Sequence, residues 1–157
     1  MKSALIKNGH VVDPKQNIDQ KMNLYVEGGK IAALTAEEPE AELVIDADGR
    51  IVCPGFIDIH MHEDEYDEVT DTICTSMSHS ALHMGVTLDI GGNCGDNVCD
   101  PVKFLDTTDR DGAPVNIGLL AGHTWLRNFR GRHDKYRPIR KEDIAEMTAD
   151  CRYCLDH

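Results

Sequence analysis

Two histidines separated by one residue are the side chains of this sequence best suited to chemistry. They end the segment PGFIDIHMH, residues 54–62, in which a Pro-Gly break precedes a short apolar run. Side chains alternate between the faces of a strand, so His60 and His62 are expected to point the same way, with Asp58 behind them. Paired imidazoles at a strand end suit a divalent transition metal, most often zinc. The alternative is a pair of surface histidines at a strand end.

A cysteine between glycines is the second candidate. Cys94 lies in the segment GGNCG, residues 91–95, directly after a short apolar segment that predicts a strand. Glycines allow the backbone to turn sharply at such a place. A thiolate there would be a soft zinc ligand, deprotonated by the metal that it binds. The alternative is a tight turn around a small buried thiol.

Two further candidates follow the next apolar segment, in GHTWLR, residues 122–127. His123 at a strand end either touches metal or substrate, or hydrogen-bonds to a metal ligand and orients it, and we favour the orienting role. Arg127 pairs either with an acidic substrate group or with the acidic surface nearby.

Near the end of the sequence, Cys151 and Cys154 share one face of an expected helix. Their spacing arises by chance or forms half of a zinc knuckle, whose second cysteine pair is missing.

Composition limits the class of protein. The 157 residues are 41% hydrophobic, enough for a core of ordinary size, and carry a formal net charge of −12, which disfavours nucleic-acid binding. The N-terminal segment lacks the apolar stretch of a secretory signal, and no apolar run reaches the length that spans a bilayer. We therefore expect a cytoplasmic protein with no membrane partner, in which the six cysteines do not form a disulfide framework.

The chain divides into two kinds of pattern. Residues 1–53 carry short strand-like runs with Gly and Asp turns, including a hairpin signal at Asn8-Gly9, and predict a small β-sandwich or meander. Residues 54–157 alternate strands with helices, and right-handed crossovers would make their sheet parallel. After the first strand, at 56–62, we expect the remaining elements in this order: helix 65–84, strand 86–90, helix 101–109, strand 114–121 and helix 139–155.

Three motifs resemble one family. FIDIHMH closely resembles the first-strand metal motif of the amidohydrolase superfamily, in which both histidines bind metal at the mouth of a (β/α)8 barrel. GNCG resembles the D-aminoacylase (N-acyl-D-amino-acid deacylase) branch, in which that cysteine is a metal ligand, and GHTWLR resembles the Gly-His-x-x-Leu-Arg segment of the same branch. Dihydroorotases and hydantoinases use instead a carboxylated lysine from a later strand.

The resemblance implies an α/β fold, with about three βα units of a TIM barrel in residues 54–157 and part of a small β-sandwich in residues 1–53. It implies one or two divalent metals, zinc first, held by His60, His62 and Cys94, with Asp58, His123 and Arg127 near them or near the substrate. The implied reaction is hydrolysis of an N-acyl-D-amino acid or related small amide. The alternative within this class is a dihydroorotase-like or hydantoinase-like cyclic amidohydrolase.

A complete barrel needs about 200 residues or more. We therefore expect later ligands and the catalytic base beyond His157, and little deacylase activity from residues 1–157 alone. A missing C-terminal remainder, or association with another copy, would cover the open edges of the sheet. The contrasting hypothesis is a non-enzyme, either truncated or completed by a partner.

Overall fold

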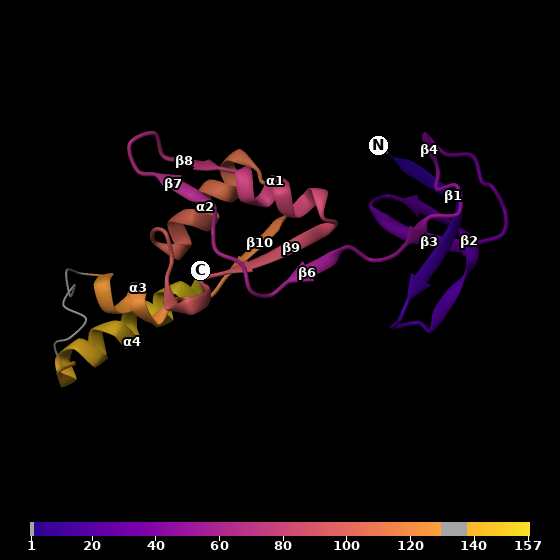
Figure 1. Cartoon of the computed structure of the whole chain (residues 1–157). Coiled ribbons are helices and arrows are strands. Elements are labelled where there is room, and N and C mark those ends of the chain that lie inside the picture. The colour runs from indigo at the N-terminus through magenta and orange to yellow at the C-terminus, as the bar shows by residue number, and fades with distance from the viewer. Residues whose placement is uncertain (1, 130–137) are drawn as a thin grey trace. The chain divides into compact units, whose positions relative to one another are not determined.

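The computed structural model describes residues 2–129 and 138–157 and separates into two units, Met1–Pro54 and Gly55–His157 (Figure 1). The first unit is a sheet in the order β3-β2-β1-β4, with β5 also paired to β1. β1 pairs antiparallel with β2, and β4 and β5 run parallel to β1. Ala4, Leu5 and Val11 of β1 are buried. The strands are β1 (Ser3–Asp13), β2 (Ile18–Glu27), β3 (Lys30–Thr35), β4 (Leu43–Asp46) and β5 (Ile51–Val52).

The Asn8-Gly9 dipeptide is not the predicted hairpin turn, because it lies within β1. Asn8 has a φ of 57°, and the register with β2 shifts between Ile6 and Gly9, which marks a bulge. Two side chains hold this conformation. The Asn8 backbone N–H donates to Asn23 Oδ1 at 2.9 Å, and its side-chain amide donates to Asp46 at 3.1 Å. The same dipeptide that favours a hairpin therefore serves here to bend a strand.

The second unit contains a three-stranded parallel sheet in the order β6-β9-β10, which is also the order of these strands along the chain. Helix α1 packs on β9 and helix α2 on β10, so each connection crosses back over the sheet (Figure 1). The elements are β6 (Phe56–Asp58), β7 (Glu65–Asp67), β8 (Thr72–Cys74), α1 (Ser76–His83), β9 (Val86–Gly91), the 3-10 turn η1 (Asn93–Gly95), α2 (Pro101–Asp111), β10 (Asn116–Leu119), α3 (His123–Asn128) and α4 (Lys141–Asp156). The buried apolar residues are Ala81, Val86, Val102, Phe104, Val115, Trp125 and Leu126.

The predicted helix over 65–84 is wrong in its first half, where β7 and β8 form an antiparallel hairpin. Asp67 Oδ1 accepts the backbone N–H groups of Val69 and Thr70, and this local bonding competes with a helix. Asp71, with a φ of 55°, accepts a hydrogen bond from Tyr66 and forms an ion pair with Arg110 of α2 at 2.6 Å. Turn chemistry therefore overrides the helical spacing of the apolar residues.

Helix α1 begins at Ser76 and is capped from a distance. Asp64 Oδ1 accepts the N–H of Met77 at 2.7 Å, and Asp64 Oδ2 accepts that of Ser78 at 3.1 Å. The carboxylate is 4% exposed, so it satisfies two orphan donors in a buried setting. The cap of α1 thus comes from an acidic residue that lies before the β7–β8 hairpin. Among the described helices, none has the length and apolar character needed to cross a membrane.

Candidate metal centre

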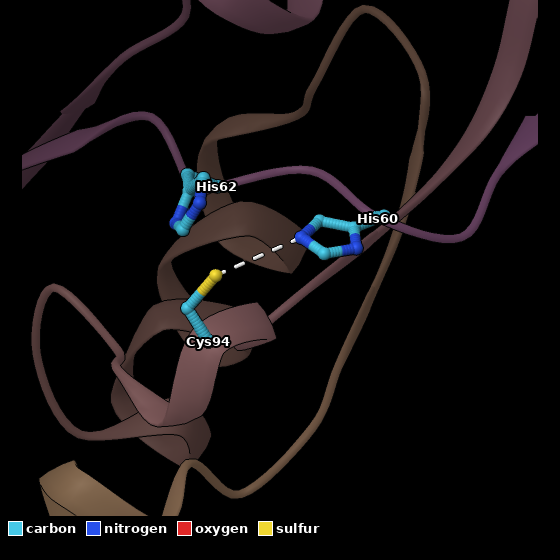
Figure 2. A group of neighbouring side chains, drawn as sticks. All are labelled: His60, His62 and Cys94. Atoms are coloured by element: carbon cyan, nitrogen blue, oxygen red, sulfur yellow. Dashed lines mark hydrogen bonds between the residues drawn. The ribbon is translucent and has the colours of Figure 1, made fainter.

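His60, His62 and Cys94 converge at one end of the parallel sheet (Figure 2). One potential ligand atom from each side chain lies within 4.8 Å of the other two, and Cys94 Sγ is 3.7 Å from His60 Nε2. The histidines follow the end of β6, and the cysteine follows the end of its neighbour β9. All three side chains are exposed. Within residues 2–129 and 138–157, this is the one group of three such side chains close enough to share a metal.

The geometry of the group fits a tetrahedral metal. With Zn–N near 2.0 Å and Zn–S near 2.3 Å, a tetrahedral site separates nitrogen from sulfur by about 3.6 Å. The observed separation of 3.7 Å between His60 Nε2 and Cys94 Sγ is close to that value. The largest separation in the group is at most 4.8 Å, and all three side chains are exposed. Two imidazoles and one thiolate are also a donor set that zinc favours.

Strand β6 ends earlier than the sequence suggested, since Asp58 is its last residue and His60 lies in a bend. Asp58 Oδ1 accepts the backbone N–H of His60 at 2.9 Å, which turns the chain out of the strand. Pairing with β9 nevertheless continues, because Met61 N–H donates to Ile90 O at 3.2 Å. Asp58 therefore contacts the backbone of a candidate ligand.

The turn that carries Cys94 depends on left-handed backbone. Gly92, Cys94 and Gly95 have φ values of 77°, 60° and 86°. A Cβ on Gly92 would lie 2.1 Å from the backbone oxygen of Leu120, so only glycine fits there. Cys94 adopts a conformation that non-glycine residues rarely adopt, and such outliers concentrate at functional sites. Burial raises the pKa of the Cys99 thiol, five residues later, to about 12.

A buried hydrogen-bond network beside the histidines was not foreseen from the sequence. Glu63, directly after His62, is 6% exposed, and its Oε1 accepts from Asn97 Nδ2 at 2.6 Å. Asn97 Nδ2 also donates to Leu120 O at 3.0 Å, and Asn97 Oδ1 accepts the N–H of Gly122 at 2.8 Å. One amide thus joins the segments that follow all three parallel strands. The available signal was the position of Glu63 directly after a candidate ligand.

His123 and Arg127 lie on α3, outside the group formed by the two histidines and Cys94. His123 is exposed at the first position of that helix and lines a pocket with α4 residues such as Met147 and Cys151. Arg127 is partly buried. Neither His123 nor the cysteines of α4 belong to a metal-sharing group in the described part of the chain. The roles assigned to His123 and Arg127 stay predictions.

Asp89 of β9 is fully buried, and neither of its carboxylate oxygens has a hydrogen-bond partner among the described residues. Burial raises the pKa of this carboxyl, and the negative charges of Asp58 and Asp64 raise it further. Asp58 is its direct register partner on β6. The folded chain therefore shifts the equilibrium of this carboxyl towards its neutral form, relative to the unfolded chain.

Comparison with known proteins finds relatives among amide hydrolases. Over 104 residues the chain is 39% identical to a dihydroorotase of Aquifex aeolicus (strain VF5), covering 65% of this chain and 24% of the relative. It is 29% identical to a D-aminoacylase of Alcaligenes xylosoxydans xylosoxydans, covering 91% of this chain and 33% of the relative. No protein-family model matches the chain. The chain thus spans about a quarter to a third of the length of these relatives.

Solved structures share the fold over almost the whole chain. An N-acyl-D-glutamate deacylase from Bordetella bronchiseptica, complexed with zinc and a phosphonate inhibitor, matches with a TM-score of 0.79 and 24% identity, covering 99% of this chain and 36% of its own. An L-hydantoinase from Arthrobacter aurescens matches with a TM-score of 0.60 and 22% identity, covering 98% of this chain and 39% of its own.

These matches confirm the predicted fold class, in which a small β unit precedes the first βα units of a TIM barrel. Relatives of two substrate types, dihydroorotases and a D-aminoacylase, share the sequence pattern, and deacylase and hydantoinase structures share the fold. Sequence and fold together place this chain in the amidohydrolase superfamily.

Proposed function

We propose that this chain carries the metal-binding part of a zinc-dependent hydrolase of non-peptide C–N bonds that acts on N-acyl-D-amino acids. The observation that carries the proposal is the convergence of His60, His62 and Cys94 at the carboxyl ends of adjacent parallel strands. Active sites of TIM barrels lie at that end of the strands. Three protein ligands are also the number found in catalytic zinc sites, which keep a position open for water or substrate.

Each residue of the group has a defined task in this proposal. His60 and His62 donate neutral imidazole nitrogens, and Cys94 donates a thiolate. Asp58 holds the backbone of His60 in the bend that aims its ring towards Cys94. A zinc ion held there supplies a Lewis acid for the substrate carbonyl. Glu63 is buried and bonded to Asn97, so among the described residues it is not placed to move protons for the reaction.

The cysteine favours a deacylase over a cyclic amidohydrolase. Cys94 occupies the position at which D-aminoacylases, by the resemblance of GNCG, supply a thiolate ligand, whereas dihydroorotases depend on a carboxylated lysine from a later strand. The second candidate remains dihydroorotase-like or hydantoinase-like hydrolysis, and it is favoured by the 39% identity to a dihydroorotase. The two candidates share the histidine pair and differ in whether the thiol is needed.

Metal binding tests the site directly. The chain is loaded with zinc, and its affinity is measured by competition with a chromophoric chelator. Cys94→Ser and His60→Ala should each lower zinc affinity by at least about 10-fold, because each removes one ligand of three. Cys74→Ser is the matched control, since Cys74 is an exposed cysteine of the same unit outside the group. Equal affinity of Cys94→Ser and Cys74→Ser would contradict the proposed ligand set.

Substrate choice requires a separate assay. The native protein that carries this chain is supplied with zinc and offered N-acetyl-D-amino acids, dihydroorotate and a hydantoin. Release of free D-amino acid, lost on Cys94→Ser, is the expected result. Turnover of dihydroorotate or hydantoin with no turnover of N-acetyl-D-amino acids would replace the proposal by the second candidate.

A further inference from the structure

We infer that Asn93 is a positioning residue that fixes Cys94 relative to the two histidines; the inference rests on the proposed function, because its consequence is metal affinity. Asn93 begins the turn η1 and immediately precedes Cys94. Its side chain extends to the neighbouring ligand segment at the end of β6. The side chains of both histidines and of Cys94 are exposed.

The amide of Asn93 binds three backbone carbonyls at once. Asn93 Nδ2 lies 2.7 Å from Ile90 O, 3.3 Å from Met61 O and 3.4 Å from Ile59 O. The first carbonyl belongs to β9, and the other two belong to the segment that carries the histidines. The amide has two hydrogens for three acceptors, so at least one hydrogen is shared between two carbonyl oxygens.

The two acceptors on the histidine segment are the peptide oxygens directly before the candidate ligands. The carbonyl of Ile59 belongs to the peptide unit of His60, and that of Met61 belongs to the peptide unit of His62. Because a peptide unit is planar and rigid, a donor that holds both carbonyls limits the rotation of the backbone at both histidines. The donor is anchored one residue from Cys94, so it also fixes the distance across the two strands.

The backbone of Cys94 makes such an anchor necessary. Cys94 is held at a φ of 60°, a left-handed conformation that is unfavourable for a residue with a Cβ. Gly92 and Gly95, on either side of it, also have positive φ. The bonds of Asn93 link this turn to an ordered strand and thereby maintain the position of the thiol.

The test replaces the donor while keeping the shape. Asn93→Asp is isosteric, but it places acceptor oxygens against three carbonyls, and Asn93→Ala removes the donor without adding charge. Asn116→Asp is the matched control: Asn116 Nδ2 donates to Thr87 O at 2.8 Å, so it also links adjacent strands through a side-chain amide. Asn116 is the first residue of β10 and lies at the end of that strand away from the metal group. The other end of β10, at Leu119, pairs with Gly91 and is the end nearer to the metal group.

Three measurements are made on the full chain: zinc affinity, the cobalt–thiolate absorption band of the Co²⁺-loaded protein, and thermal unfolding without metal. Both Asn93 variants should bind zinc about 10- to 100-fold more weakly and weaken the cobalt–thiolate band, as expected when a group that orients ligands is removed. Asn116→Asp should keep both properties. Thermal unfolding of the metal-free variants separates general destabilisation, which also affects the control, from displacement of the thiol.

The outcomes distinguish this inference from the proposed function. Zinc binding by the unsubstituted chain, together with unchanged affinity and an unchanged cobalt band in both Asn93 variants, overturns the inference and leaves the metal centre standing. Failure of the unsubstituted chain to bind zinc overturns the proposed function and the inference with it. An equal loss of affinity in Asn116→Asp also overturns the inference, because the effect would then not depend on contact with the histidine segment.

Discussion

Replacing Gly92 by alanine, directly after β9, should destabilise the chain more than the same replacement of Gly85, directly before β9. Gly92 has a φ of 77°, and its added Cβ would lie 2.1 Å from Leu120 O and 2.9 Å from Asn97 Nδ2. Leu120 O and Asn97 Nδ2 are hydrogen-bonded to each other at 3.0 Å. The methyl group therefore meets both members of a bond that joins the segments after β9 and β10.

The expected loss has two parts. Left-handed backbone costs a residue with a Cβ about 1–2 kcal/mol. A carbon atom 2.1 Å from a backbone oxygen requires a shift of about 1 Å, and forced shifts of this kind in packed sites cost about 1–3 kcal/mol. The sum, about 2–5 kcal/mol, is a large part of the 5–15 kcal/mol that typically stabilises a domain.

Gly85→Ala separates the two parts. Gly85 precedes β9 with a φ of 85°, and its added Cβ would meet only the Phe56 ring at 3.5 Å, an ordinary contact. The Gly85→Ala variant should therefore lose only the part of the unfolding free energy that left-handed backbone costs. Equilibrium urea unfolding of the three proteins gives the free energies of unfolding, and Gly92→Ala should be at least about 1 kcal/mol less stable than Gly85→Ala. Failure of Gly92→Ala alone to fold would have the same meaning, whereas equal stability of the two variants would refute the reasoning.

Two more predictions concern buried carboxylates. Asp64→Ala removes two bonds to the start of α1, to Met77 N and Ser78 N, and should lower the free energy of unfolding by about 1–2 kcal/mol; an unchanged urea midpoint would show that α1 does not need this cap. For Asp89, burial raises the folded-state pKa above the ordinary value of 3.8, so its favourable contribution is complete below that pH and is lost as pH rises through the raised pKa. Asp89→Asn should therefore be more stable than the unsubstituted chain at pH 7, with the difference shrinking as pH falls to 4. A less stable Asn variant at pH 7 would contradict this account.

The sequence was most informative where the regular spacing of apolar residues determines the secondary structure. Apolar residues from Val86 to Ile90 predicted β9, and the carboxyl ends of parallel strands meet at one edge, which is why His60 and Cys94 were expected near each other. That proximity follows from topology and needs no side-chain detail. Whether these residues bind metal stays a prediction.

The features that the sequence did not reveal depend on single polar contacts. The Asn8-Gly9 bulge is set by Asn23 and Asp46, which are distant in sequence, and a local turn rule does not include them. The β7–β8 hairpin depends on Asp67 and Asp71 rather than on apolar spacing. The bond between Glu63 and Asn97 joins residues that come together only once the sheet has formed. Periodicity carries no information about such pairs.

The β7–β8 hairpin is attached to α2 in part by exposed charged side chains. Asp71 and Arg110 are each about half exposed, with side-chain exposures of 46% and 50%, and Lys103 lies over the Tyr66 ring at 4.8 Å from its centre. Exposed contacts of these kinds stabilise a structure only weakly, and they weaken further with added salt. Amide protons of the hairpin should therefore exchange with solvent before those of β9, and faster as ionic strength rises. Because the hairpin starts three residues after His62, we expect added salt to loosen the chain beside the metal group as well.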